Sequence, residues 1–119
     1  MIAVIFEVRP AGGRKHDYLG LAASLRRDLE SIDGFISVER FQSLTDPGKL
    51  LSLSFWRDEV AVRAWRAKQV HRAAQQAGRG GIFAEYRLRV ASVVRDYGMN
   101  ERVQAPEDSR AVHDEKAAL

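Results

Sequence analysis

The side chains of this 119-residue chain that could do chemistry gather around one transition from strand to helix. An apolar segment ends at Trp56, and the segment after it carries Trp65 and then His71. An imidazole titrates near neutral pH, so His71 could remove a phenolic proton and leave an electron-rich anion that reacts with O₂. The two indoles could form walls of a pocket for a planar ligand. The structural alternatives are core or sheet-sealing tryptophans and an exposed helical histidine.

Arginines near the end of the predicted domain form a second group of candidates. Arg87, Arg89 and Arg95 fall on one face of an alternating segment, and Tyr86 falls on the other face. A guanidinium could stabilise a substrate enolate, a phenolate or a reduced-oxygen anion, and Arg87 is the catalytic candidate among them. The structural alternative is an ion pair with an acid such as Glu7.

Several other chemistries are excluded or disfavoured by the residue types. The sequence contains no cysteine, which excludes disulfides, thiolate catalysis and zinc sites built on cysteine. No metal-ligand spacing or nucleophile triad is present, so we predict no metal. The glycines around Arg79 follow a helical pattern and lack the lysine of a phosphate-binding loop.

Composition and charge narrow the class of protein further. A length of 119 residues indicates one domain, and 45% hydrophobic with 29% charged residues is typical of a globular protein. No apolar run approaches the roughly 20 residues of a membrane span, and the N-terminal segment does not resemble a secretory signal, so we expect a cytoplasmic protein. The bases are scattered arginines, which favours a small anionic ligand, or plain solubility, over nucleic acid.

Hydrophobic periodicity predicts six elements in the order β-α-β-β-α-β. Their expected ranges are 1–9, 14–31, 35–44, 49–56, 57–77 and 86–97. This order predicts an α+β, ferredoxin-like domain with an antiparallel sheet over residues 1–97. Residues 98–119 hold five acids against three bases and are expected to form an extended or partly disordered tail.

The predicted strands carry apolar side chains on both faces, and Phe35 and Phe41 are expected to share one of them. Helices can cover only one face, so we predict a homodimer in which two sheets pack face to face. Unpaired buried charges are costly, so the charged residues of the second face should be paired. These are Glu7, Glu39 or Arg40, and Arg87 or Arg89.

Four sequence motifs carry a family resemblance. They are Ile32-Asp33-Gly34-Phe35, Ser52-Leu53-Ser54-Phe55-Trp56-Arg57, Ala64-Trp65-Arg66 and His71. With these motifs the chain resembles, over about residues 1–97, the antibiotic biosynthesis monooxygenase family of small dimeric α+β barrels.

The resemblance implies a cofactor-independent oxygenase that acts on a planar phenolic or quinonoid small molecule. A non-catalytic, dimeric small-molecule-binding or stress-response module is the alternative that it also allows. The predicted catalytic residues are His71 and Arg87. The predicted substrate-binding residues are Trp65, Trp56, Glu7 and Tyr86.

A haem-degrading branch of the same family is the third reading. That branch resembles this chain in a tryptophan on the second helix, which Trp65 matches. It also uses an asparagine near the end of the first strand and a histidine ten residues after the tryptophan, where this chain has Glu7 and Gln75. A glutamine does not replace imidazole as an axial iron ligand, so haem is disfavoured.

Overall fold

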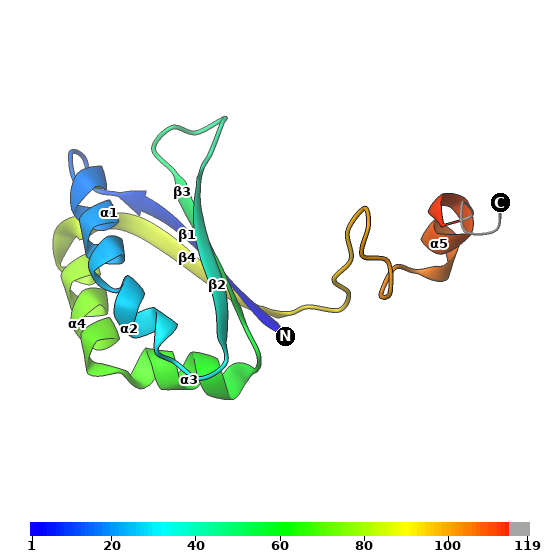
Figure 1. Cartoon of the computed structure of the whole chain (residues 1–119). Helices are drawn as coiled ribbons and strands as arrows, with labels where there is room; N and C mark the ends of the chain where they lie inside the picture. Colours follow the sequence, from blue (N-terminus) through cyan, green and yellow to red (C-terminus); the bar gives the residue numbers. More distant parts are fainter. Residues whose placement is uncertain (115–119) are drawn as a thin grey trace.

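The computed structural model describes residues 1–114, apart from the side chains at 69, 70 and 78. The elements are β1 (Ile2–Pro10), α1 (Lys15–Ser24), α2 (Arg26–Glu30), β2 (Phe35–Gln42), β3 (Leu50–Trp56), α3 (Glu59–Ala67), α4 (Gln69–Ala77), a π-helical turn (Gly78–Ile82), β4 (Phe83–Ser92) and α5 (Glu107–His113). The strands form one antiparallel sheet in the order β2-β3-β1-β4. The helices between the strands all lie on one face of it (Figure 1). The predicted ferredoxin-like α+β fold is confirmed.

Each of the two predicted helices is divided by a break. The first is interrupted at Leu25, whose backbone N–H turns back to the carbonyls of Ala22 and Ala23. The second is interrupted at Lys68, which has an extended backbone with ψ 136°. As a result α3 runs across one end of the sheet and α4 turns along it (Figure 1). The break at Lys68 matters because it brings the last turn of α3 beside the first turn of α4.

The layer between sheet and helices is packed as two separate clusters. One cluster centres on Val8, Tyr18 and Leu50, and the other centres on Leu29, Trp56 and Ala61. In the β1–β3 pair, Val8 lies opposite Leu50 at one end and Ile2 lies opposite Trp56 at the other. The two clusters therefore fill the two ends of the layer.

Trp56 is the anchor of the second cluster. It is 2% exposed, and its indole N–H donates to Ser54 Oγ at 2.9 Å, so the buried donor is satisfied. Its ring meets the Phe35 ring edge to face, with centroids 5.3 Å apart. The prediction that Phe35 and Phe41 share a face was wrong. The register of β2 shifts between Phe35 and Ser37, so Phe35 packs on the helix side while Phe41 points to the outer face.

The outer face of the sheet carries no helix (Figure 1). Glu7 lies there among apolar residues and pairs with Arg89 at 3.2 Å and Lys49 at 3.5 Å. The hydrogen bond from Arg89 is the main reason that the pKa of Glu7 is lowered. Arg9 pairs with Asp46 at the same side of the sheet. The prediction that Glu7 is paired with an arginine is confirmed.

The chain beyond β4 forms an arm that leads away from the sheet (Figure 1). Strand β4 ends at Ser92, earlier than predicted, and the arm contains the helix α5. Arg102 holds the arm together: its guanidinium donates to Asp114, Ser109 and the carbonyl of Gly98 at 2.7 to 3.2 Å. Among the described residues, no helix has the length and apolar character to cross a membrane.

Candidate functional site

A cavity of about 390 Å³ lies between the inner face of the sheet and the helices. Its origin is the inner face of β3, where Ser52 and Ser54 stand between Leu50 and Trp56. Protein interiors are close-packed, so two small side chains in the middle of a strand leave room that larger ones would fill. The space between the two core clusters is therefore hollow.

Two cross-strand rows form the floor of the cavity. The first row, from β2 to β4, is Arg40, Ser52, Phe6 and Leu88, and the second is Val38, Ser54, Val4 and Val90. At the β4 side, Tyr86, Leu88 and Val90 remain 43 to 53% exposed although they line the cavity. The cavity is thus open to solvent along β4, which provides a route for a ligand.

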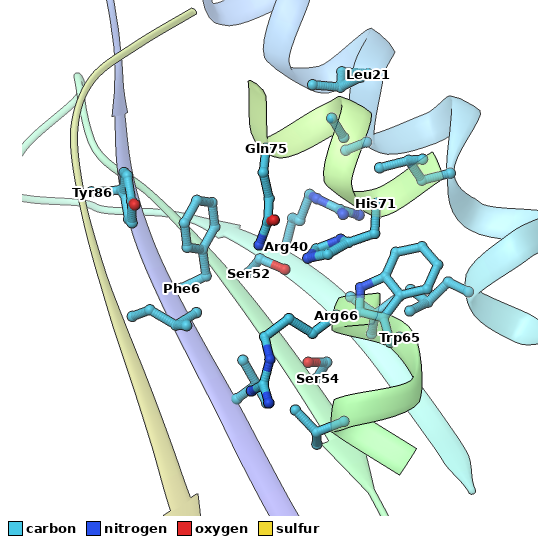
Figure 2. A pocket seen from close by; sticks show the side chains of 18 of the residues that line it. Phe6, Leu21, Arg40, Ser52, Ser54, Trp65, Arg66, His71, Gln75 and Tyr86 are labelled. Atoms are coloured by element: carbon cyan, nitrogen blue, oxygen red, sulfur yellow. The ribbon is translucent and has the colours of Figure 1, made fainter. Parts of the chain in front are cut away.

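The helix break at Lys68 builds the opposite wall. Because of this break, the ring centroids of Trp65 and His71 lie 4.7 Å apart, and the two ring planes are inclined by 46°. Gln75, one turn further along α4, also lines the cavity. Figure 2 shows His71 and Gln75 directed from α4 into the space above the sheet, with the indole of Trp65 beside the imidazole.

The environment of His71 favours a neutral imidazole that can accept a proton. Its Nδ1 is buried and has no hydrogen-bond partner among the described residues. Burial lowers the pKa of His71 below the ordinary value of 6.5, and the charges of Arg72 and Arg66 lower it further. The imidazole is therefore uncharged at neutral pH and can take a proton from a bound molecule.

Three arginines line the same cavity: Arg40, Arg66 and Arg79. Arg79 donates to the phenolic oxygen of Tyr86 at 2.9 Å, and the Nε of Arg40 is buried without a partner among the described residues. No aspartate or glutamate belongs to the described lining. The cavity thus combines apolar walls with an excess of positive charge.

The structure brings four of the six predicted site residues to this cavity. His71, Trp65, Trp56 and Tyr86 all line it. Trp56 lies there as a buried member of the core, which fits the structural alternative stated for it.

Glu7 and Arg87 do not reach the cavity. They lie opposite one another in the β1–β4 pair, on the outer face. Side chains alternate along a strand, so the neighbours Phe6 and Tyr86 point inward and these two point outward. Glu7 and Arg87, predicted as substrate-binding and catalytic residues, therefore lie outside the lining of this cavity. The arginines that line it are Arg40, Arg66 and Arg79.

Sequence reasoning missed Arg40 and the two serines as site residues. The signal for the serines was present, because Ser52 and Ser54 occupy the inward positions of a strand whose other inward residues are Leu50 and Trp56. Small polar residues at such positions indicate a hollow or a ligand contact. Arg40 had been grouped with the outer face, since the shift at the start of β2 was not readable from the pattern.

Fold and cavity together define a small α+β protein with a basic, aromatic-walled cavity. The sequence profile of the antibiotic biosynthesis monooxygenase family matches residues 1–77, which is most of the folded domain. The chain belongs to the antibiotic biosynthesis monooxygenase family, as the resemblance predicted.

Two curated relatives share part of the chain. The jasmonate monooxygenase ABM of Pyricularia oryzae is 48% identical over 101 residues, which cover 85% of this chain and 47% of the relative. The uncharacterised protein YqjZ of Bacillus subtilis is 34% identical over 62 residues, covering 52% of this chain and 53% of the relative. The chain spans about half the length of the curated relatives it matches.

Solved structures support the fold. The protein Rv0793 of Mycobacterium tuberculosis has a TM-score of 0.73 and 15% identity, covering 82% of this chain and 98% of its own. SnoaB, a cofactor-independent oxygenase of Streptomyces nogalater, has a TM-score of 0.70 and 12% identity, covering 80% of this chain and 94% of its own. At these identities the likeness shows the fold alone.

Proposed function

We propose that this chain is a monooxygenase, an oxidoreductase whose substrate is a small molecule with a planar, apolar body. The observation that carries the proposal is the uncharged imidazole of His71, which lines the cavity beside Trp65 and whose Nδ1 has no hydrogen-bond partner among the described residues. The 48% identity to a protein named as a monooxygenase supports the reaction class. The fold shared with a cofactor-independent oxygenase supports a reaction without a resident cofactor.

In the proposed reaction His71 takes a proton from a phenolic or enolic hydroxyl of the bound substrate. The resulting anion gives one electron to O₂, and the two radicals combine to form a carbon-bound peroxide. Breaking the O–O bond of this peroxide with loss of water leaves a carbonyl group. One oxygen atom enters the product and the other leaves as water, and the substrate supplies all the electrons.

The walls of the cavity support these steps physically. Trp65 and Phe6 offer ring faces to a planar substrate, and the rest of the apolar lining limits water around the anion. Arg66 and Arg79 place positive charge near the region where negative charge develops.

The test is incubation of the protein under ¹⁸O₂ with two compounds, followed by mass spectrometry of the products. Anthrone represents the phenolic class, and jasmonate is included because of the relative's name. Neither incubation contains an added reductant, because in the proposed reaction the substrate supplies all the electrons. We expect one labelled oxygen atom in the product of at least one compound, and loss of product in the His71→Ala variant.

The alternative is a binding module without turnover. Ligand-induced thermal stabilisation by a compound that is never oxidised would favour this alternative over the monooxygenase. Product that forms equally well in wild type, His71→Ala and Trp65→Phe would contradict the roles proposed for these residues.

We further propose that two copies pair through their outer sheet faces. The support is the apolar surface of Ile5, Leu51, Leu53 and Phe55, which no helix of the described chain covers. The arm leads away on the open side of the sheet (Figure 1) and carries exposed apolar groups at Met99 and Val103. If two copies pack against each other through this surface, each copy buries apolar area that a lone protomer exposes to water.

Analytical ultracentrifugation tests the pairing. We expect a dimer at micromolar concentration and a monomer in Leu53→Arg, because the longer, charged side chain would disrupt the apolar packing at the centre of the interface. Val60→Arg is the matched control, since Val60 is exposed on α3 and 63% accessible. A stable wild-type protomer would contradict the pairing.

A further inference from the structure

We propose that the cavity is built for an organic acid, and that Arg40 binds the carboxylate of the ligand. This inference rests on the proposed function because it concerns the same cavity. It names the chemical class of the ligand and one further binding residue. It can be tested by binding alone, without turnover.

The first observation is the state of Arg40 itself. Its side chain leaves β2 toward the helices, is only partly exposed, and has a buried Nε without a hydrogen-bond partner among the described residues. A guanidinium carries five N–H donors and cannot lose its charge in a protein. A buried N–H donor without a partner costs free energy, and a ligand oxygen that reached it would remove that cost.

The second observation is the contrast with other arginines of the chain. Arg9, Arg57 and Arg89 each pair with a carboxylate. Arg40 and Arg66 have no ion pair among the described residues, and no carboxylate belongs to the described lining of the cavity. Other arginines without an ion pair among the described residues, such as Arg63 and Arg87, are exposed to solvent. Arg40 instead is partly buried beside a cavity whose described lining has no carboxylate, which leaves a positive potential for an anionic ligand there.

The third observation is the order of groups along the cavity floor. Arg40 is followed across the sheet by Ser52 and then by Phe6. Directly opposed residues of neighbouring strands lie within about 5 Å of one another, so the Ser52 hydroxyl is placed to reach the same anion as Arg40. Beyond it, the Phe6 ring provides an apolar surface for the body of the ligand.

This order of residues determines how a bound ligand is oriented in the cavity. A carboxylate at Arg40 accepts two parallel N–H bonds from the planar fork of the guanidinium. The rings of the ligand then extend over Phe6 toward the open side at β4. Arg40, Ser52 and His71 all line the cavity, and Figure 2 shows the three side chains in the same part of the view. Arg40 thus selects the ligand and sets which of its atoms face His71.

A carboxylate and a neutral amide of the same shape distinguish this proposal from simple hydrophobic binding. Isothermal titration calorimetry without O₂ would compare 2-naphthoate with 2-naphthamide. We expect the wild-type protein to bind the acid about tenfold or more tighter than the amide, as charge-assisted hydrogen bonds predict. The preference should disappear in Arg40→Met and be partly kept in Arg40→Lys.

The matched control is Arg63→Met, on the exposed side of α3 and outside the cavity lining. It should bind both compounds as the wild type does. Thermal unfolding of each variant shows whether it folds; if Arg40→Met does not, Arg40→Gln replaces it, and its amide should bind the acid no more tightly than 2-naphthamide.

Three results would overturn the inference: equal binding of acid and amide by the wild type, an acid preference that survives in Arg40→Met, or no binding of either compound. The proposed function fails separately. An Arg40-dependent acid preference in a protein that oxidises nothing would leave this inference standing. Oxidation of neutral substrates only, with equal binding of acid and amide, would leave the function standing and remove the inference.

Discussion

On the outer face of the sheet Glu7 lies between Arg89 and Lys49, and both pair with it. On the inner side, Arg40 of β2 and His71 of α4 each have a buried nitrogen without a hydrogen-bond partner among the described residues. Side chains alternate along each strand, so the same four strands supply both faces. On the outer face Glu7 and Arg9 are neutralised within the fold, whereas Arg40 has no carboxylate partner among the described residues.

The two faces of the sheet are expected to have different functions. A paired charge beside apolar residues suits a surface that another protein copy covers, because no unmet charge is buried there. An unpaired guanidinium next to an uncharged imidazole suits a site for an acidic, ionisable ligand. Substitutions on the inner face should therefore change chemistry, and matched substitutions on the outer face should not.

The largest effect is expected for His71→Ala, measured with whichever compound the wild type oxidises. Loss of a positioned general base should lower the turnover rate by about a hundredfold to ten-thousandfold. Thermal stability should change little, because His71 is only partly buried. His16→Ala, at an exposed position in α1, is the control and should keep wild-type turnover. An unchanged turnover rate in His71→Ala would show that His71 is not the general base and would contradict a reaction site on the inner side of the sheet.

Trp56→Ala should produce the largest loss of stability. Truncating a fully buried tryptophan typically costs about 3 to 5 kcal/mol of the free energy of unfolding. Trp56 is 2% exposed and also satisfies its N–H through Ser54. Trp65→Ala should cost clearly less, because Trp65 is partly exposed at the cavity wall. Urea unfolding of both variants measures this, and equal losses would mean that Trp65 is a core residue.

The pH dependence of stability should reveal the environment of His71. Its pKa is lower in the folded protein than the 6.5 expected when unfolded, so the unfolded chain binds more protons as the solution is acidified. The stability that comes from the neutral imidazole is complete above pH 6.5 and is lost as pH falls toward the folded pKa. The free energy of unfolding, measured by urea titration at each pH, should therefore change less steeply with pH for His71→Gln than for wild type. Identical slopes would contradict the lowered pKa.

The smallest effects are expected from Glu7→Gln and Arg87→Gln on the outer face. Both side chains lie on the far side of the sheet from the cavity. Turnover and ligand affinity should stay within about twofold of wild type, as is usual for substitutions away from a site. A loss of about tenfold or more in ligand binding by either variant would show that the outer face contributes to the site.

Much of the fold could be predicted because alternation in β1 and β3, the Thr45-to-Gly48 turn and the spacing of α1 are local signals. His71 and Trp65 were predicted as members of one site because both follow the strand-to-helix transition in the sequence and both belong to the family resemblance. Their ring contact itself depends on the break at Lys68. Arg40 was not, since one irregular step at the start of β2 decides which face each later residue takes.

The pairing of Glu7 with an arginine was predictable because an unpaired acid in an apolar strand carries a large free-energy cost, and Arg89 is the arginine that pairs with it. The volume of the cavity was not predictable in this way. It depends on two serines, a helix break at Lys68 and the two clusters that close the ends of the layer. Those features act together only once the chain is folded.

The most direct test of the central claim is an NMR titration of the isotope-labelled protein with 2-naphthoate. The account predicts that the amide signals of Arg40 and Ser52 and the indole signal of Trp65 shift together. Those of Glu7, Arg87 and Arg89 should stay in place. Shifts confined to the outer-face residues, or no shifts at saturating acid, would contradict a ligand site built on the unpaired inner face.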